Sequence, residues 1–124
     1  MGDKGQRVVV VGASAKPERY SNRAVHLLIQ HGHEVVPVNP AVSSIEGLPV
    51  VSRIEDLSGH VDTLTLYVSE EKSSALEDAI IHLHPDRVIF NPGAENPALR
   101  ATLEANGIST EEACTLVLLS TNQF

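Results

Sequence analysis

The sequence predicts an α/β fold, with a mostly parallel sheet of five to six strands and helices on both faces of that sheet. Three observations lead to this prediction. Short apolar runs alternate with stretches of helical periodicity along the 124 residues. The connections between these stretches are short, which favours strand–helix–strand units. Residues 8–11 are all valine, which is typical of a strand that is covered on both faces.

Six strands are predicted from the apolar runs and the turn residues that separate them. They lie near residues 7–12, 34–38, 49–51, 62–67, 87–90 and 108–110. Because strands and helices alternate, the layout is Rossmann-like, and we expect one domain over residues 1–124.

Three helices are predicted between these strands. They occupy residues 20–32, 70–83 and 96–106. The first ends on Gly32, a common stop residue, and the third has Pro97 in its first turn, where proline is favoured. The segment 111–124 is ambiguous, and its run from Ala113 to Leu119 is most simply a final helix packed on the sheet.

Charge and composition argue against several classes of partner. The 16 acidic and 9 basic residues give a net charge of −7, which opposes attraction to nucleic acid or anionic lipid. No apolar run approaches the roughly 20 residues of a membrane span, and the first residues do not resemble a signal peptide. Cys114 is the lone cysteine, so we expect no internal disulfide and a cytoplasmic location.

The loop after the first predicted strand is where a ligand is expected, because ligands of open α/β sheets bind beyond the carboxyl ends of the strands. Gly12, Ser14 and Pro17 stand at the three glycine positions of the dinucleotide fingerprint G-x-G-x-x-G. Gly12 keeps the tight turn, whereas Ser14 offers a hydroxyl in place of a glycine. The loop is therefore a degenerate version of a phosphate-binding turn.

Basic residues gather in the same loop. Lys16, Arg19 and Arg23 fall within eight residues that contain one acid, Glu18. Backbone N–H groups at the start of the next helix add further donors and a favourable dipole. This combination indicates a site for a polyanionic nucleotide, and the structural alternative is a solvated basic helix start.

The residues at the end of the second predicted strand help to distinguish a site for NAD from a site for a nucleotide with a phosphorylated ribose. An NAD enzyme carries an acid there, about 20 residues past the glycines, to hold the ribose hydroxyls. Here the strand ends in Val38, Asn39 and Pro40, without an acid. This favours a phosphorylated ribose, and an NADP site stays open although no arginine follows Asn39 closely.

Five segments occur in an order that is typical of one known family. They read V-V-V-V-G-A-S-A-K-P-E-R-Y-S-N (8–22), P-V-N-P (37–40), I-E-G-L-P-V (45–50), V-D-T-L-T-L-Y-V (61–68) and N-P-G-A-E-N (91–96). In this combination the chain resembles the single-domain CoA-binding proteins, which are related to the CoA-binding domain of the succinyl-CoA synthetase α subunit. The resemblance covers about residues 7–114.

The resemblance implies coenzyme A, free or acylated, as the ligand at the carboxyl ends of the strands. Residues 12–14 would line the pyrophosphate turn, and Lys16, Arg19 and Ser21 would meet the phosphates. Residues 38–40 would flank the adenosine, and residues 67–69 and 91–93 would border the pantetheine. The cofactor-binding residues implied in this way are Gly12, Ala13, Ser14, Lys16, Pro17, Arg19, Ser21, Val38, Asn39, Pro40, Tyr67, Val68, Asn91, Pro92 and Gly93.

Catalysis by the chain alone is not expected. The synthetases carry a phosphorylated histidine in a second domain, which we do not expect here, so the resemblance does not imply ligase activity. No set of nucleophile, base and orienting residue can be assembled, and no catalytic residue is assigned. Two alternatives to purely structural roles are Glu95 as a general base near the CoA thiol and Cys114 as a partner in a mixed disulfide with CoA.

No metal site is assigned either. His31 and His33 form one close pair and His82 and His84 another. Both pairs are expected at the amino-terminal edge of the sheet, opposite the ligand, where helix ends favour a cation.

The function predicted is binding of coenzyme A or an acyl-CoA. An NADP-binding redox enzyme or sensor is one alternative. A docking module for a separate acyl-CoA ligase subunit is the other, and a homodimer formed through the apolar C-terminal run is also open.

Overall fold

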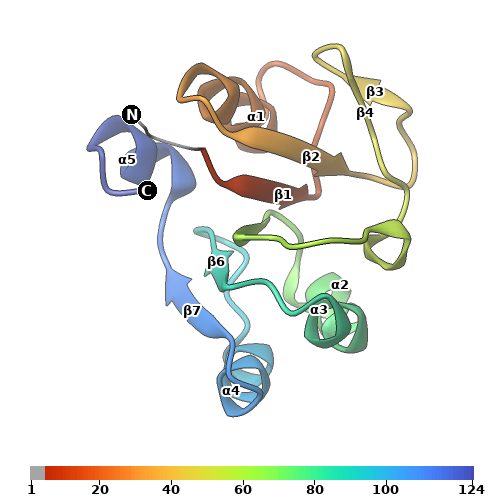
Figure 1. Cartoon of the computed structure of the whole chain (residues 1–124), viewed down its shortest axis with the longest axis vertical. Helices are drawn as coiled ribbons and strands as arrows, with labels where there is room; N and C mark the ends of the chain where they lie inside the picture. The colour runs from red at the N-terminus through yellow and green to blue at the C-terminus, as the bar shows by residue number, and fades with distance from the viewer. Residues whose placement is uncertain (1–4) are drawn as a thin grey trace.

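The structure is a computed structural model that describes residues 5–124. Its centre is a sheet of five parallel strands in the order β2-β1-β5-β6-β7 (Figure 1). The strands are β1 (Arg7–Val11), β2 (Glu34–Val38), β5 (Thr63–Leu66), β6 (Arg87–Phe90) and β7 (Ser109–Glu112). The chain runs from β1 outward to β2 and then returns to the other side of β1 at β5, so the strand order reverses at β1. The predicted α/β class and parallel sheet are confirmed.

Helices cover both faces of the sheet. They are α1 (Tyr20–Gln30), α2 (Glu70–Ser74), α3 (Glu77–Leu83), α4 (Pro97–Ala105) and α5 (Thr115–Ser120), with a 3₁₀ turn η1 at Ile54–Asp56. Figure 1 shows α1 and α5 on one side of the sheet and α3 and α4 on the other. No helix in the described part of the chain is long and apolar enough to cross a membrane.

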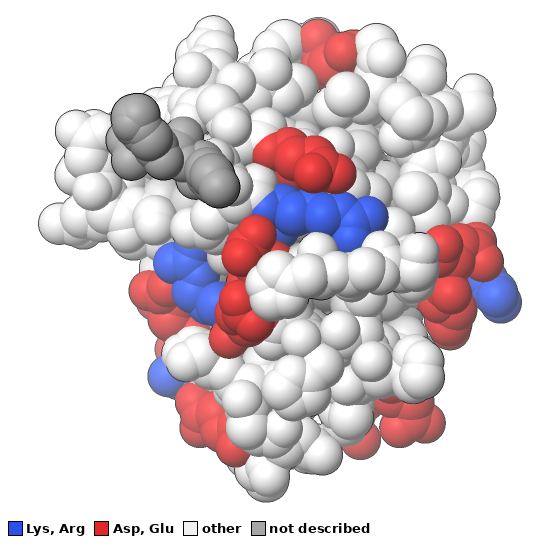
Figure 2. All heavy atoms as spheres, in the orientation of Figure 1, with Lys and Arg blue, Asp and Glu red and all other residues white. Residues whose placement is uncertain are grey.

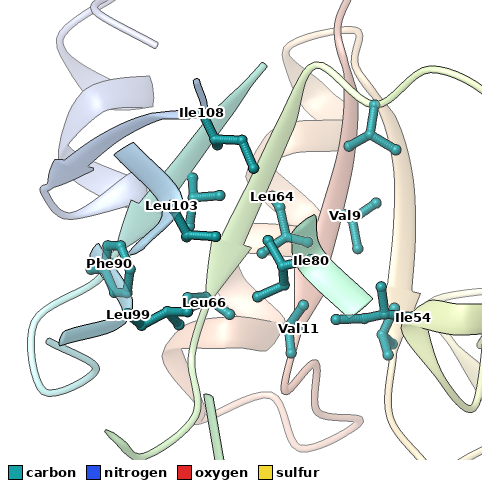
Figure 3. Packing of buried hydrophobic residues seen from close by; sticks show 13 residues of the cluster. Val9, Val11, Ile54, Leu64, Leu66, Ile80, Phe90, Leu99, Leu103 and Ile108 are labelled. Carbon is teal, nitrogen blue, oxygen red and sulfur yellow. The ribbon is translucent and has the colours of Figure 1, made fainter. Parts of the chain in front are cut away.

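The alternating sides of β1 explain its run of valines. Val8 and Val10 pack under α1 and α5, with Leu28 and Leu119. The opposite side faces the cluster shown in Figure 3, which joins β1, β5 and β6 to η1, α3 and α4. Its labelled members are Val9, Val11, Ile54, Leu64, Leu66, Ile80, Phe90, Leu99, Leu103 and Ile108. Burial on both faces therefore requires apolar residues at every position of the strand.

The strand predicted near residues 49–51 does not join the sheet. Leu48–Pro49 (β4) instead pairs antiparallel with Ser44–Ile45 (β3). Glu46 and Gly47 join them, both with positive φ (53° and 78°), as a two-residue hairpin turn requires. Val51, from the predicted strand, forms an isolated parallel bridge to Val38 of the sheet.

The helix predicted over residues 70–83 is broken into α2 and α3. The reason is a side chain from another element. The amide of Asn96, at the start of α4, donates to the Glu70 carbonyl oxygen (3.2 Å) and to the hydroxyls of Ser73 and Ser74 (2.9 Å each). Ser73 Oγ also donates to the Glu70 carbonyl. These hydrogen bonds compete with the regular helical pattern, so the first helix ends at Ser74 and the next begins at Glu77.

The last segment is also corrected. Glu111 and Glu112, which lie in the ambiguous segment, lengthen the edge strand β7, and the helix expected over the run Ala113–Leu119 begins at Thr115 as α5. Arg87 Nη1 of β6 lies 3.1 Å from Glu111 Oε1 and favours the extended position. Thr115 N donates to Asn91 Oδ1 (2.9 Å), which fixes where α5 begins.

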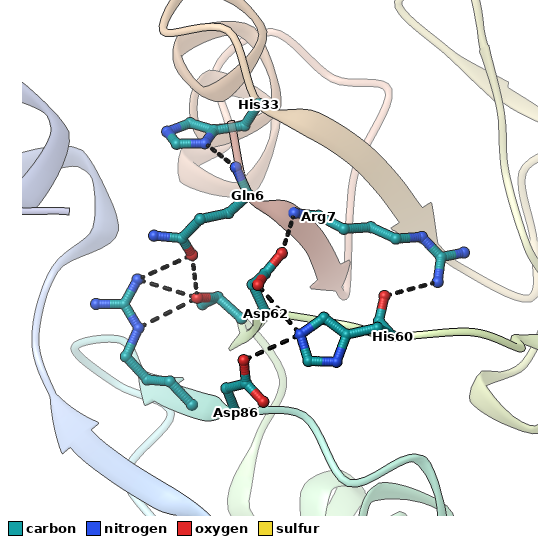
Figure 4. A network of polar contacts seen from close by, with 8 residues as sticks. Gln6, Arg7, His33, His60, Asp62 and Asp86 are labelled. Atoms are coloured by element: carbon teal, nitrogen blue, oxygen red, sulfur yellow. Dashed lines mark hydrogen bonds and ion pairs between the residues drawn. The ribbon is translucent and has the colours of Figure 1, made fainter. Parts of the chain in front are cut away.

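A polar network joins the amino ends of β1, β5 and β6 (Figure 4). Arg7 N donates to Asp62 Oδ2 (2.7 Å). Thr63 Oγ1 donates to Gln6 Oε1 (2.6 Å) and accepts from Arg87 Nε (3.2 Å). These hydrogen bonds connect the three strands at the amino-terminal edge of the sheet, and we call this network the rim.

His33 belongs to this rim in its neutral form. Gln6 N donates to His33 Nδ1 (2.9 Å), which must therefore be unprotonated. Burial lowers the pKa of His33 below 6.5, and His31 and Arg87 act in the same direction while Asp62 opposes them. Protonation of this ring would break the hydrogen bond to Gln6.

Acid should therefore destabilise the wild type more than the variant His33→Asn. Because the folded pKa lies below the unfolded one, this contribution to stability is present above pH 6.5 and is lost as the pH falls through the folded pKa. An asparagine oxygen can still accept from Gln6 but cannot gain a proton. We expect the free energy of unfolding of the wild type, minus that of the variant, to decrease from about pH 7.5 to about pH 5 in urea denaturation. A difference independent of pH would contradict this account.

Candidate functional site

A cleft of about 1220 Å³ opens at the carboxyl ends of β1, β2 and β5. Its volume exceeds the roughly 300–1,000 Å³ of ordinary small-ligand pockets, so it can take a long ligand. The cleft lies where the strand order reverses, which is the usual binding position in open α/β sheets. The loop between β1 and α1, the end of β2 and the end of β5 form its walls.

Gly12 makes the turn that brings the chain out of β1 over the sheet. Its φ is +86°, and an added Cβ would lie 2.8 Å from Val68 Cγ1 and 3.0 Å from the Tyr67 carbonyl oxygen. The turn therefore needs a glycine both for its backbone conformation and for the close approach of the segment after β5.

Two asparagine side chains fix the loop that follows. Asn39 Nδ2 donates to the Ala13 carbonyl oxygen (2.7 Å), and Asn22 Nδ2 donates to the Ser14 carbonyl oxygen (2.8 Å). In a planar trans peptide the carbonyl and the next N–H point in opposite directions. The N–H groups of Ser14 and Ala15 therefore face away from the two asparagines, and neither donates to another described residue.

This geometry changes the role of the predicted turn. The N–H groups of Gly12 and Ala13 both donate to the Val38 carbonyl oxygen (3.1 and 3.3 Å), and Ser14 Oγ accepts from Lys16 N (3.1 Å). These groups hold the loop together rather than presenting donors. The N–H groups left for an anion are those of Ser14 and Ala15, and two consecutive amides of this kind form an anion-binding concavity.

The charges that line the cleft differ from those of the whole chain. Lys16, Arg19, Arg53 and Lys72 are four of the nine basic residues, and Glu55 is the one acid among the described residues that line it. Lys16, Arg19 and Lys72 form no ion pair with any described residue. The face seen in Figure 2 shows the opposite arrangement, because its blue basic groups lie beside red acidic ones.

Thirteen of the fifteen predicted cofactor-binding residues line this cleft. They are Gly12, Ala13, Ser14, Lys16, Arg19, Ser21, Val38, Asn39, Pro40, Tyr67, Val68, Pro92 and Gly93. Pro17 instead lines a separate hollow of about 380 Å³ between α1 and α5. The fifteenth, Asn91, is 1% exposed and lines neither.

Asn91 is a structural residue at the end of β6. Its Nδ2 donates to Thr65 Oγ1 (2.6 Å) and to the Leu66 carbonyl oxygen (2.9 Å). Its Oδ1 accepts from Thr115 N, as described above, and Thr115 Oγ1 lies 2.8 Å from Thr65 Oγ1. With its polar atoms used in this way, Asn91 ties β5 and β6 to the start of α5.

Tyr67 lines the cleft but offers it no ionisable group, because its side chain packs against the core cluster under α1 and α5. Its hydroxyl is buried without a hydrogen-bond partner among residues 5–124. Burial raises the pKa of Tyr67 to about 12, so the hydroxyl keeps its proton at neutral pH. Tyr67 can therefore supply apolar surface beside Val68, whereas it cannot act as a base.

Two of the four cations that line the cleft, Arg53 and Lys72, were not predicted from the sequence. Lys72 lies three residues after Ser69, at the carboxyl end of β5, where the rule that ligands bind at strand ends could have found it. Arg53 lies far along the chain from the loops of β1 and β2 and carried no sequence signal.

Glu95 and Cys114, the two residues considered above for a chemical role, have surroundings that favour a structural one. The Glu95 carboxylate accepts from Gly93 N through both oxygens (3.0 and 3.1 Å), so it closes the turn after β6. Cys114 is half-buried just before α5 and does not line the cleft.

A group of possible metal ligands lies at the other edge of the sheet. His60 Nε2 is 3.2 Å from Asp62 Oδ1 and 3.0 Å from Asp86 Oδ2 (Figure 4). Among the described residues it is the one such group found, and it contains neither of the histidine pairs considered above. These contacts are those of exposed ion pairs, which are common without a metal.

The substitution Gly12→Ala should destabilise the fold more than Gly93→Ala. Both glycines have positive φ, which costs a residue with a Cβ about 1–2 kcal/mol, but a Cβ at Gly93 meets nothing within 4 Å. The clash at Gly12 should cost a further ~1–3 kcal/mol. Urea denaturation of the two variants measures the difference, and equal losses would contradict the close approach of Val68.

Comparisons with known proteins agree with this geometry. Residues 6–120 match the family described as CoA binding domain. A crystal structure of an uncharacterized protein superposes with a TM-score of 0.92 at 36% identity, covering 98% of this chain and 100% of that one. An acetyl-coenzyme A synthetase from Ca. Korarchaeum cryptofilum, in complex with phosphate and ADP, has a TM-score of 0.73 at 21% identity. That match covers 89% of this chain and 26% of the synthetase.

The uncharacterized protein YneT of Bacillus subtilis (strain 168) is 29% identical over 87 residues. The match covers 70% of this chain and 63% of that protein's length, which is less than two thirds. The family match extends over almost all of the described residues, from before β1 to the end of α5. The chain therefore belongs to the CoA binding domain family.

Proposed function

We propose that this chain binds coenzyme A, free or acylated, in the cleft at the carboxyl ends of β1, β2 and β5. The isolated chain binds this ligand without catalysing a reaction and without a metal. The observation that carries the proposal is the charge of the cleft: four cations and one acid line it on a chain of net charge −7. Coenzyme A carries a pyrophosphate and a 3′-phosphate, which need clustered cations and main-chain donors.

The parts of the cleft match the parts of the ligand. The N–H groups of Ser14 and Ala15, with Lys16 and Arg19 beside them, suit the pyrophosphate. The adenosine would lie at the end of β2. The pantetheine would run along the mostly apolar wall after β5 and β6, which is formed by Tyr67, Val68, Pro92, Gly93 and Ala94.

A second role is compatible with the same binding. The synthetase fold neighbour is about four times as long as its matching part, so this fold occurs there as one piece of a larger chain. The chain would then serve as the CoA-binding subunit of a separate acyl-CoA ligase. Co-purification of the tagged full chain with a ligase subunit would favour this role.

Calorimetric titration of the wild type with CoA tests the proposal. We expect Arg19→Ala to weaken binding by about tenfold to a hundredfold, because a charge-assisted hydrogen bond to phosphate contributes about 1.5–3 kcal/mol. Arg23→Ala is the matched control, because Arg23 lies on the same basic segment but faces the hollow between α1 and α5. We expect it to bind CoA as the wild type does.

Two results would contradict the proposal. The first is the absence of CoA binding by a folded wild type. The second is an equal loss in the Arg19 and Arg23 variants, which would indicate an effect of overall charge rather than a site in the cleft. Titration with NADP and NAD in parallel separates the redox alternative from the CoA site.

A further inference from the structure

The end of β2 pairs with Val51, which lies 13 residues after Val38 in the sequence. Val51 N donates to the Pro37 carbonyl oxygen (2.9 Å), and Asn39 N donates to the Val51 carbonyl oxygen (3.0 Å). This short parallel bridge makes Val51 a neighbour of Val38. The residues that follow it, Ser52 and Arg53, therefore continue past the carboxyl end of β2 and line the cleft there.

Arg53 has little to hold it in the absence of a ligand. Its side chain is 65% exposed, and its one ion-pair contact among the described residues is with Asp56, at 3.8 Å between Nη2 and Oδ1. By comparison, Arg7 and Arg87 contact their acidic partners at 3.3 and 3.1 Å. Glu55, two residues further along the chain, also lines the cleft, and Arg53 is the one cation among the lining residues 52–55.

The rest of the strand end does not suit an unmodified ribose. There is no acid between Val38 and Val42 to accept from ribose hydroxyls. The Asn39 side chain is held within the fold, because its Nδ2 donates to the Ala13 carbonyl oxygen and its Oδ1 accepts from Ala41 N (2.7 Å). The residues that directly follow β2 include no acid, and a guanidinium beside such a strand end suits a phosphorylated ribose.

We propose that Arg53 binds the phosphomonoester on the adenosine ribose of the ligand, which is the 3′-phosphate when the ligand is coenzyme A. This inference rests on the proposed function and adds a selectivity to it: the site prefers CoA over dephospho-CoA. Lys16 and Arg19, on the β1 loop, are left to the pyrophosphate. The two groups of phosphates are thus bound by cations from different segments of the chain.

The test is calorimetric titration of the wild type, Arg53→Gln and Lys16→Gln with CoA and with dephospho-CoA. We expect Arg53→Gln to weaken CoA by about tenfold and to leave dephospho-CoA unchanged, so that the preference disappears. Lys16→Gln is the control for loss of charge and should weaken both ligands by the same factor. Because Arg53 is exposed, both variants are expected to fold, which thermal denaturation checks.

The outcomes separate the two proposals. If the wild type binds CoA but Arg53→Gln keeps the preference, or loses both ligands equally, the role of Arg53 is wrong and the CoA site stands. Equal binding of CoA and dephospho-CoA by the wild type has the same meaning. If the wild type binds neither, CoA is the wrong ligand, and NADP and NAD are titrated next. If the wild type prefers NADP over NAD and Arg53→Gln loses this preference, Arg53 binds a ribose phosphate although CoA is not the ligand. If none of these nucleotides binds, both proposals are wrong.

Discussion

The cleft depends on how the chain leaves β1. The Val38 carbonyl at the end of β2 accepts from Gly12 N and Ala13 N, and the side chains of Asn39 and Asn22 hold the next two carbonyls. Two of these hydrogen bonds anchor the start of the loop on β2, and the other two hold the Ala13 and Ser14 carbonyls so that the following N–H groups face away from the asparagines. The outward position of these N–H groups does not come from Gly12 alone, since it requires β2 and α1 to be in place first. A local sequence motif becomes a site only through its tertiary contacts.

The alternation of strands and helices could be predicted because it depends on local patterns. Burial on both faces forces apolar residues along β1, and the same pattern marks β5 and β6. The errors arose where a distant side chain decides the local structure. Asn96 interrupts the helix predicted over residues 70–83, and Asn91 delays the start of α5 to Thr115. Each asparagine satisfies backbone groups of a segment more than 20 residues away, which no periodicity of that segment can reveal.

The candidate site was predictable to the extent that its residues follow strand ends. The β1 loop, the end of β2 and the residues after β5 are found in this way. Asn91 also follows a strand, but its side chain is hydrogen-bonded back to Thr65 and Leu66 of β5. A position just after a strand is therefore not sufficient to predict that a side chain contacts a ligand. Arg53 is the opposite case, because two backbone hydrogen bonds of Val51 bring it beside β2. The absence of an arginine soon after Asn39 therefore says little about the charge at that strand end.

The charged residues at the two edges of the sheet have different surroundings, which explains how an acidic chain could bind the anionic ligand that we propose. At the amino-terminal edge Arg7 and Arg87 are bound by Glu34 and Glu111, so these cations are neutralised within the fold. At the carboxyl-terminal edge Lys16 and Arg19 have no such partner among the described residues. The net charge repels an anion at long range, but salt screens that repulsion beyond about 8 Å at physiological ionic strength. Inside the cleft the ligand that we propose would meet Lys16 and Arg19 at close range, where their local field would outweigh the net charge of the chain.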